Sequence, residues 1–251
     1  MEQTKALVRE MGDKYKSCIS THPLHDTLNL EKAREQHAAY CKTLREIGLE
    51  VIYVPRDDEH PDSCFVEDNA VVHNGKALIC RMAKQSRRGE EIGVEAVLKQ
   101  YMQTKRAIAP ATIEGGDVVH LSDKLISGIS QRTNPEGIAQ MQEWLGIPVS
   151  TIFDPSIMHL KSYVTYLGKG IMIAAERYVA HPALKGYSII IPPGNEEYAA
   201  DTLSVGDTVL MAKGYDEARK MVEEEGFNVI ILDVSEVQKC DGALTCLSIL
   251  F

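Results

Sequence analysis

Long apolar runs and an excess of positive charge are both missing from this sequence of 251 residues. No apolar stretch approaches the roughly 20 residues of a membrane helix, and the first residues, MEQTKALVRE, lack the apolar core of a signal peptide. The formal charge of -9, with acidic and basic residues interspersed, argues against a surface for nucleic acid or anionic membrane. We therefore expect a cytoplasmic protein, and an acidic pocket for a cationic ligand remains open.

Cysteine motifs are also missing. The cysteines form no CxxC pair and no Cys/His metal spacing; they are Cys18, Cys41, Cys64, Cys80, Cys240 and Cys246. In a reducing compartment most of them are predicted to be small buried hydrophobic side chains. His22, His25 and Cys18 lie close together in a lid-like stretch, residues 17–28, but without the spacing of a ligand set, so we interpret them as loop residues. No metal or organic cofactor is expected.

A unit of about fifty residues recurs along the chain and predicts strand, turn, strand, amphipathic helix and closing strand. Four copies open at VEDNAVV (66–72), IEGGDVV (113–119), HLKSYVTYL (159–167) and LSVGDTVLMA (203–212). Helices are predicted over about 86–102, from Asn134 as N-cap and Pro135 to Gly146, and over about 215–225, with a shortened helix in the third copy. The closing strands are predicted near Ala107 and at VSTIF, YSIIIP and FNVIILDV.

A fifth unit is split between the two ends of the chain. GALTCLSILF supplies its first strand, while KALVR, a helix over 31–47 and LEVIYV supply the rest. Pairing of the terminal strands would close a ring and hide the sheet edges. The predicted fold is α/β, a five-bladed α/β propeller of repeated ββαβ units with pseudo-fivefold symmetry. With 44% hydrophobic residues, we expect one domain over residues 1–251.

The repeat brings reactive side chains to equivalent positions. Glu67, Glu114, His159 and Cys246 lie at or just ahead of the first strand of their units, at spacings of 47, 45 and about twice 44 residues. Equivalent positions in a closed ring lie at equal distances from its axis, so a thiol, an imidazole and two carboxylates should converge. This predicts Cys246 as nucleophile, His159 as acid and base, and Glu114 as the carboxylate that orients the imidazole.

Carboxylates and arginines near the predicted axis indicate the substrate. Asp62, Glu67, Asp68, Asp117 and Asp241 gather there, and a desolvated guanidinium needs bidentate acceptors, for which we choose Asp68 and Asp241. A plain turn at Asp241 and a strand-end cap at Asp117 are the structural alternatives.

Arg87 and Arg132 occupy matching positions where two helices begin, although the helix dipole disfavours a cation there. Either they clamp the α-carboxylate of an amino acid or they are solvated surface arginines.

The motifs VEDNAVV, SRRGE, IEGGDV, QRTN, HLKS and DGALTC, in this order, resemble the dimethylarginine dimethylaminohydrolase family over residues 6–251. That family belongs to the guanidino-modifying superfamily of five-bladed propellers, with arginine deiminases and amidinotransferases. The resemblance implies Cys246, His159 and Glu114 as catalytic residues, Asp68 and Asp241 as guanidinium ligands, Arg87 and Arg132 on the α-carboxylate, and Asp62 on the α-amine. Glu67 falls in the family's site as well.

The expected reaction is hydrolysis of free Nω-methylated L-arginine to L-citrulline and a methylamine. Lys161 stands where arginine deiminases usually carry an acidic residue, and the chain has no room for their added helical domain. Three alternatives stay open: a compact arginine deiminase, an amidinotransferase and a non-catalytic binding module. Ser20, near the position of a leucine that covers the substrate in animal enzymes, departs from that pattern. The expected partner is a small guanidino amino acid, and a homodimer is compatible with the sequence.

Overall fold

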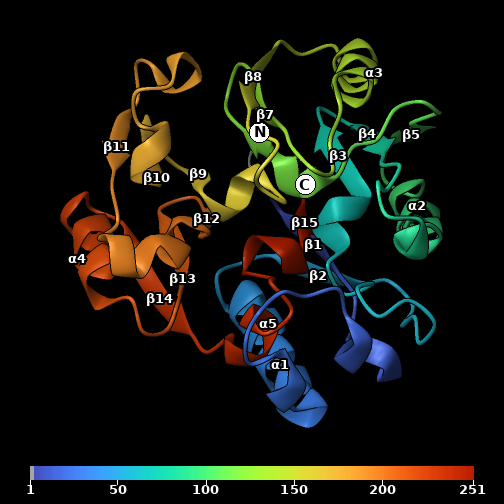
Figure 1. The fold of residues 1–251 in the computed structure, drawn as a ribbon, viewed down its shortest axis with the longest axis horizontal. Coiled ribbons are helices and arrows are strands. Elements are labelled where there is room, and N and C mark those ends of the chain that lie inside the picture. Colours follow the sequence, from blue (N-terminus) through green and yellow to red (C-terminus); the bar gives the residue numbers. More distant parts are fainter. Residues whose placement is uncertain (1–2) are drawn as a thin grey trace.

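The computed structural model of the protein describes residues 3–251, and in it five separate three-stranded sheets lie around the middle of the molecule (Figure 1). The four longer helices, α1 to α4, lie at the periphery. The sheets have the strand orders β3-β4-β5, β6-β7-β8, β9-β10-β11, β12-β13-β14 and β15-β1-β2. In each sheet the central strand pairs antiparallel with one neighbour and parallel with the other. The α/β class and the recurring strand pattern are therefore confirmed.

The first two units follow the predicted order closely. They comprise β3 (Ala70–His73), β4 (Lys76–Ile79), α2 (Glu90–Leu98), β5 (Gln103–Arg106), β6 (Val118–His120), β7 (Leu125–Ile129), α3 (Pro135–Leu145) and β8 (Val149–Phe153). The side chain of Asn134 caps α3 by accepting from the Gly137 N–H, and Gly146 ends the helix with a φ of 71°. The helix predicted over 86–102 is shorter, because Gln85–Arg87 forms a 3₁₀ turn and Gly89, with a φ of 118°, precedes α2.

The third and fourth units differ in their helices. They comprise β9 (Val164–Gly168), β10 (Ile171–Ala174), β11 (Ser188–Ile190), β12 (Leu203–Val205), β13 (Thr208–Ala212), α4 (Asp216–Glu224) and β14 (Asn228–Leu232). The shortened helix predicted in the third unit is two 3₁₀ turns, Glu176–Tyr178 and Pro182–Leu184. Proline at 182 and glycine at 186, with a φ of 96°, leave too few residues for a regular helix before β11.

The fifth unit joins the two ends of the chain. Strand β1 (Lys5–Val8) pairs antiparallel with β15 (Ile249–Leu250) and parallel with β2 (Glu50–Tyr53), and α1 (Leu30–Glu46) connects β1 to β2. The Lys5 N–H donates to the Phe251 carbonyl at 2.8 Å. The predicted pairing of the terminal strands is confirmed, and it fixes the segment that carries Cys246 beside β1. A short fifth helix, α5 (Ser235–Gln238), precedes that segment.

The apolar core is divided among the units and continues between neighbours. In one cluster Met141 and Leu145 of α3 pack with Leu125 of β7 and with Leu78 of the preceding unit. The Trp144 indole N–H also donates to the Ala77 carbonyl at 3.0 Å, which ties α3 to β4. Such shared packing fixes adjacent units, and with them the turns ahead of their first strands. No helix in residues 3–251 is long and apolar enough to cross a membrane.

Candidate active site

A 3₁₀ segment precedes the first strand in all five units, and each of the four predicted reactive residues lies in one of these segments or just before it. Glu67 lies in Val66–Asn69, Glu114 precedes Gly115–Asp117, His159 precedes Leu160–Ser162, and Cys246 lies in Thr245–Leu247. These turns contact one another although they are far apart in sequence. The spacing argument therefore predicted their common location.

His159 and Glu114 form a buried ion pair. His159 Nε2 donates to Glu114 Oε2 at 2.8 Å and lies 3.6 Å from Asp68 Oδ1. Burial alone would lower the pKa of His159, but the carboxylates of Asp68, Glu114 and Asp117 outweigh it and raise the pKa to about 9. The imidazole is therefore protonated at neutral pH and carries a proton that it can give to a leaving amine.

Glycine lets the neighbouring backbone approach this pair. A Cβ added at Gly116 would lie 2.8 Å from Asp68 Oδ1 and from His159 Cγ, and one at Gly115 would meet the Glu67 carbonyl oxygen at 2.0 Å. The Gly116 N–H also donates to Asp68 Oδ1 at 3.1 Å. The two glycines of the EGGD motif are thus required by the close approach of two turns.

Arg87 is buried among carboxylates. Its guanidinium contacts Glu90 through two bonds, Nε to Oε1 at 3.0 Å and Nη2 to Oε2 at 2.8 Å, and Asp68 Oδ2 through Nη1 at 2.8 Å. Nη1 also lies 3.6 Å from Glu114 Oε2. These anions explain how a cation is stable at a helix start, and they exclude the surface alternative for Arg87. Glu90 was missed by the sequence analysis, although it follows Arg87 by three residues.

Arg132 is buried but poorly paired. Its side chain is 2% exposed, and Nε and Nη1 have no hydrogen-bond partner among the described residues. Nη1 lies 3.7 Å from Glu114 Oε1, too far for a hydrogen bond. A buried guanidinium with free donors calls for an acceptor, which an incoming carboxylate would supply.

Cys246 is partly exposed and has a free thiol. Burial of its sulfur and the nearby carboxylates of Asp201, Asp68 and Glu67 raise the pKa of the thiol well above its usual range. In this state the group is a thiol and not a thiolate. A bound cation would reverse part of that shift, as the sequence analysis expected of a guanidinium.

Asp201 is a further site residue that the sequence analysis missed. It follows the 3₁₀ segment Gly194–Ala200 and precedes β12, so it occupies in the fourth unit the place that His159 and Cys246 occupy in theirs. Its Oδ1 accepts from the Thr245 N–H at 3.4 Å, and burial raises its pKa to about 7. Dividing the long spacing between His159 and Cys246 in half would have located it.

Glu67 and Lys161 neutralise each other. Lys161 Nζ lies 2.6 Å from Glu67 Oε1, and both side chains are largely buried. Both line a cavity of about 590 Å³ that also borders Thr245 and Ser248. Oε1 of Glu67 is therefore partnered before any ligand arrives, whereas its buried Oε2 has no hydrogen-bond partner among the described residues.

Asp117 acts as a cap of the chain, which was the alternative to a role in substrate binding. Its Oδ1 accepts from the Leu160 N–H at 2.9 Å and its Oδ2 from the Ser130 hydroxyl at 2.6 Å. Burial raises its pKa to about 6. It positions the turn after His159 and adds to the negative charge around that imidazole.

Asp62 and Asp241 are joined to the lid segment, by which we mean residues 17–28. The Ile19 N–H donates to Asp62 Oδ1 at 3.1 Å, and Thr21 donates to Asp241 Oδ2 through its N–H at 2.6 Å and its hydroxyl at 3.0 Å. Asp241 has a φ of 52°, a left-handed conformation that fits the predicted turn. A cavity of about 610 Å³ is lined by Thr21, Asp201 and Asp241, among others.

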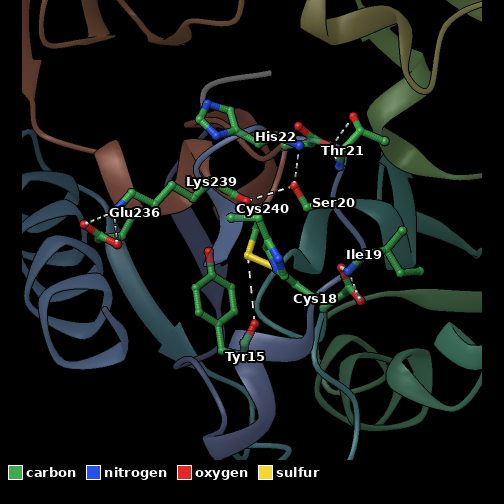
Figure 2. The surroundings of a disulfide bond; sticks show 12 residues. Tyr15, Cys18, Ile19, Ser20, Thr21, His22, Glu236, Lys239 and Cys240 are labelled. Atoms are coloured by element: carbon green, nitrogen blue, oxygen red, sulfur yellow. Dashed lines mark hydrogen bonds and ion pairs between the residues drawn. A yellow bond between two sulfur atoms is a disulfide. The ribbon is translucent and has the colours of Figure 1, made fainter. Parts of the chain in front are cut away.

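Two of the cysteines form a bond that was not predicted from the sequence. Cys18 and Cys240 form a disulfide across 222 residues of sequence, with a Cα–Cα distance of 5.9 Å (Figure 2). Cys41, Cys64 and Cys80 are free and buried, as predicted. His25 is more than a loop residue, because its Nε2 lies 3.4 Å from Cys18 Sγ. Sequence spacing within the lid segment missed this group because the second sulfur comes from the other end of the chain.

A metal ion does not fit the cluster of Asp68, Glu114 and His159 well. Ligand atoms of Asp68, Glu114 and His159 lie within 4.8 Å of one another. However, the high pKa of His159 places a proton on the nitrogen that a metal would need, and Arg87 already neutralises the carboxylates. The arrangement favours proton transfer by an ion-paired imidazolium.

Comparison with known proteins decides the family. Residues 13–180 match the family model described as N,N dimethylarginine dimethylhydrolase, eukaryotic. A curated N(G),N(G)-dimethylarginine dimethylaminohydrolase of Pseudomonas aeruginosa is 36% identical over 88% of this chain and 89% of its own length. The chain belongs to the dimethylarginine dimethylaminohydrolase family. It is accordingly a hydrolase of C–N bonds in guanidino compounds, and the resemblance seen in the motifs is confirmed.

Two solved structures of the family are similar throughout. A cysteine-to-serine variant of the Pseudomonas aeruginosa enzyme, complexed with citrulline, covers 100% of both chains with a TM-score of 0.97 and 32% identity. The second structure is a histidine-to-glycine variant of dimethylarginine dimethylaminohydrolase, solved as an adduct with S-methyl-L-thiocitrulline. It covers 99% of this chain and 100% of its own, with a TM-score of 0.96 and 32% identity. Dimethylarginine dimethylaminohydrolases therefore share the whole fold of this chain.

Proposed function

We propose that the protein hydrolyses Nω-methylated L-arginine to L-citrulline and methylamine or dimethylamine through a covalent thiouronium intermediate on Cys246. The observation that carries the proposal is the buried His159–Glu114 pair, whose imidazole has a pKa of about 9. A protonated imidazole suits a reaction whose leaving group is an amine. The citrulline complex and the thiocitrulline adduct of the two family structures support the product and a covalent species in those proteins.

In the proposed first half-reaction the guanidinium binds between Asp68 and Asp241. Its positive charge lowers the pKa of the Cys246 thiol, which burial and Asp201 otherwise raise, so that the thiol releases its proton to solvent and becomes the thiolate. Sulfur attacks the guanidinium carbon and forms a tetrahedral adduct. His159 then protonates the methylated nitrogen, the C–N bond breaks, and the amine leaves a thiouronium on Cys246.

In the second half-reaction the neutral His159 takes a proton from water. The resulting hydroxide attacks the thiouronium carbon, the C–S bond breaks with its electron pair leaving on sulfur, and the hydroxyl proton of the adduct passes to that sulfur, which gives neutral citrulline and regenerates the Cys246 thiol. Glu114 holds the imidazole through Nε2 in both steps and stabilises its charged form. One imidazole therefore serves as acid and then as base.

For the amino-acid end of the substrate we assign Arg132 to the α-carboxylate and Asp62 to the α-amine. Nε and Nη1 of Arg132, which have no hydrogen-bond partner in residues 3–251, support the first assignment. Arg87, already bound to Asp68 and Glu90, contributes charge and holds Asp68 in place. Glu67, paired with Lys161, forms part of the wall of the site.

We also propose that residues 1–251 form one domain, a closed five-bladed propeller. The equal composition of the five sheets and the β1–β15 pairing support it. A ring of this kind explains why the turns of distant units contact one another near His159.

A substrate screen tests the proposed reaction. Purified protein is incubated with Nω,Nω-dimethyl-L-arginine, Nω-methyl-L-arginine or L-arginine, citrulline is measured, and a Cys246→Ser variant serves as control. We expect kcat/KM for a methylated substrate to exceed that for arginine at least about tenfold, or about 1.4 kcal/mol. Faster turnover of arginine would establish the compact arginine deiminase instead, and ornithine formation that requires an acceptor amine would establish an amidinotransferase.

A further inference from the structure

The Cys18–Cys240 disulfide joins the lid segment, which contacts Asp62 and Asp241, to the segment that carries Asp241. Figure 2 shows Ile19, Ser20 and Thr21 following Cys18, with Lys239 next to Cys240. The Ser20 hydroxyl donates to the Lys239 carbonyl at 2.9 Å, directly across the disulfide. Asp241 follows Cys240 immediately, so the covalent bond sets the distance between the lid segment and this carboxylate.

The lid segment holds both carboxylates but leaves oxygen atoms for a substrate. Thr21 uses its N–H and its hydroxyl on Asp241 Oδ2, so these two bonds leave Asp241 Oδ1 unoccupied. The Ile19 N–H is shared between the two oxygens of Asp62, at 3.1 and 3.4 Å. Because Thr21 is exposed and Ile19 is half-buried, packing contributes little to their placement. The covalent anchor at Cys18 supplies the constraint.

The other end of the lid segment is anchored without the disulfide. Lys239 Nζ donates to the Thr27 carbonyl at 3.1 Å, and Glu236 Oε2 accepts from the Asn29 N–H at 2.8 Å. Leu28 is buried in the core. Loss of the S–S bond therefore removes the covalent constraint on residues 19–24, which are then held at that end by the packing of Cys18 and by the hydrogen bonds of Ile19, Ser20 and Thr21, while the rest of the fold keeps its contacts.

His25 faces the disulfide and is partly open to solvent. Its Nε2 lies 3.4 Å from Cys18 Sγ, and its side chain is 25% exposed. An imidazole at this distance can protonate a departing Cys18 thiolate or accept the proton of a Cys18 thiol, and both steps assist thiol–disulfide exchange. A disulfide with a histidine beside one sulfur has the chemistry of a reversible bond.

We propose that Cys18–Cys240 is a reversible redox modification site that sets substrate affinity by holding residues 19–21 against Asp62 and Asp241. The proposal rests on the proposed function for its kinetic consequence. In the disulfide form both carboxylates are oriented before the substrate binds. In the dithiol form residues 19–21 must be ordered on binding, so substrate binding is weaker while the chemistry at Cys246 and His159 is unchanged.

The redox step is a two-electron exchange with a dithiol reductant. A thiolate of the reductant attacks one sulfur of the pair, the S–S bond breaks, and the other sulfur leaves as a thiolate that takes up a proton. The second thiol of the reductant then resolves the mixed disulfide and becomes oxidised itself. Glutathione disulfide, as the oxidant, reverses the reduction and forms the Cys18–Cys240 bond again.

The test compares KM and kcat of the full chain in the two redox states. Wild-type protein is treated with dithiothreitol or with glutathione disulfide, and the reagent is then removed. The formation of citrulline from Nω,Nω-dimethyl-L-arginine is measured. We expect KM to rise about tenfold on reduction, or about 1.4 kcal/mol, with kcat within about twofold. The Cys18→Ser/Cys240→Ser protein should keep the high KM after either treatment, whereas Cys41→Ser, the matched control, should respond like wild type.

Two readouts need no activity and separate this proposal from the proposed function. Peptide mass mapping reports the Cys18–Cys240 linkage, and limited proteolysis within residues 19–24 should be faster after reduction. Equal KM values or equal proteolysis in verified disulfide and dithiol forms would overturn the proposal. So would one Zn²⁺ retained per reduced chain after incubation with zinc chloride, because Cys18, Cys240 and His25 would then be metal ligands. A fall in kcat of the double variant under oxidation would report modification of Cys246 instead. The comparison of KM values between the two redox states would still decide the proposal.

Discussion

The surroundings of His159 and those of Asp241 are held in different ways. Around His159 the partner side chains are buried, and two of them, Glu114 and Asp68, are 0% and 3% exposed. Asp241, in contrast, is half-buried and takes its bonds from the exposed Thr21. The first region is fixed by ion pairs and by close backbone contact, and the second by a disulfide and a few hydrogen bonds.

This difference separates the region of the chemical step, around His159, from the region that the substrate passes, at the lid segment. Proton transfer requires an imidazole fixed in charge and direction, which a desolvated cluster of ion pairs provides. Substrate entry requires a segment that can be ordered when the ligand binds. Changes in the His159 region should therefore act on kcat, and changes in the lid segment should act on KM. The following substitutions test that division, from the largest expected effect to the smallest.

Replacing Cys246 with serine should have the largest effect. A serine hydroxyl is a much weaker nucleophile than a thiolate, so we expect kcat to fall on the order of 10⁴-fold. Binding of L-citrulline, measured by calorimetry, should remain, because the carboxylates and arginines are untouched. Cys41→Ser is the matched control and should retain full activity. A Cys246→Ser protein with more than about a tenth of wild-type kcat would refute the nucleophile assignment.

Glu114→Gln should lower kcat about 10²-fold or more and lower the pKa of His159 from about 9. Because this native pKa lies above the unfolded value of about 6.5, the charge of His159 stabilises the fold below about pH 6.5, and that stability is lost as pH rises through about 9. An NMR titration of the His159 ring measures the shift directly. Glu143→Gln, on the exposed face of α3, is the control. An unshifted titration would mean that Asp68 and Asp117 charge the imidazole without Glu114.

Arg132→Lys tests recognition of the α-carboxylate. Lysine keeps the charge but loses the planar fork of donors, and a lost charged hydrogen bond costs about 1.5 to 3 kcal/mol. We expect KM for methylarginine to rise about tenfold or more, with a smaller change in kcat. Agmatine-type analogues, which lack the carboxylate, should not distinguish the variant from wild type. An unchanged KM would move the carboxylate to Arg87.

The same division explains what could be predicted from the sequence. The five units and the gathering of the turns that carry Glu114, His159 and Cys246 follow from a regular spacing and from strand and helix patterns, which are local signals. Glu90 as partner of Arg87, Lys161 as partner of Glu67, and Cys240 as partner of Cys18 were missed. Each of these pairs depends on how two turns or loops are oriented in space, and no period in the sequence encodes that orientation.

Thr21→Val should have the smallest effect and is the most selective test of the lid segment. The substitution removes the hydroxyl bond to Asp241 Oδ2 but keeps the backbone bond to the same oxygen and the Cys18–Cys240 disulfide. A neutral hydrogen bond contributes about 0.5 to 1.5 kcal/mol, and exposure places this bond at the low end. We expect KM to rise about two- to threefold with kcat unchanged. Thr27→Val, which loses a hydroxyl bond to the Leu24 carbonyl within the same segment, is the control. If Thr21→Val lowered kcat and left KM alone, the lid segment would act on the chemical step, and the separation of the two regions would fail.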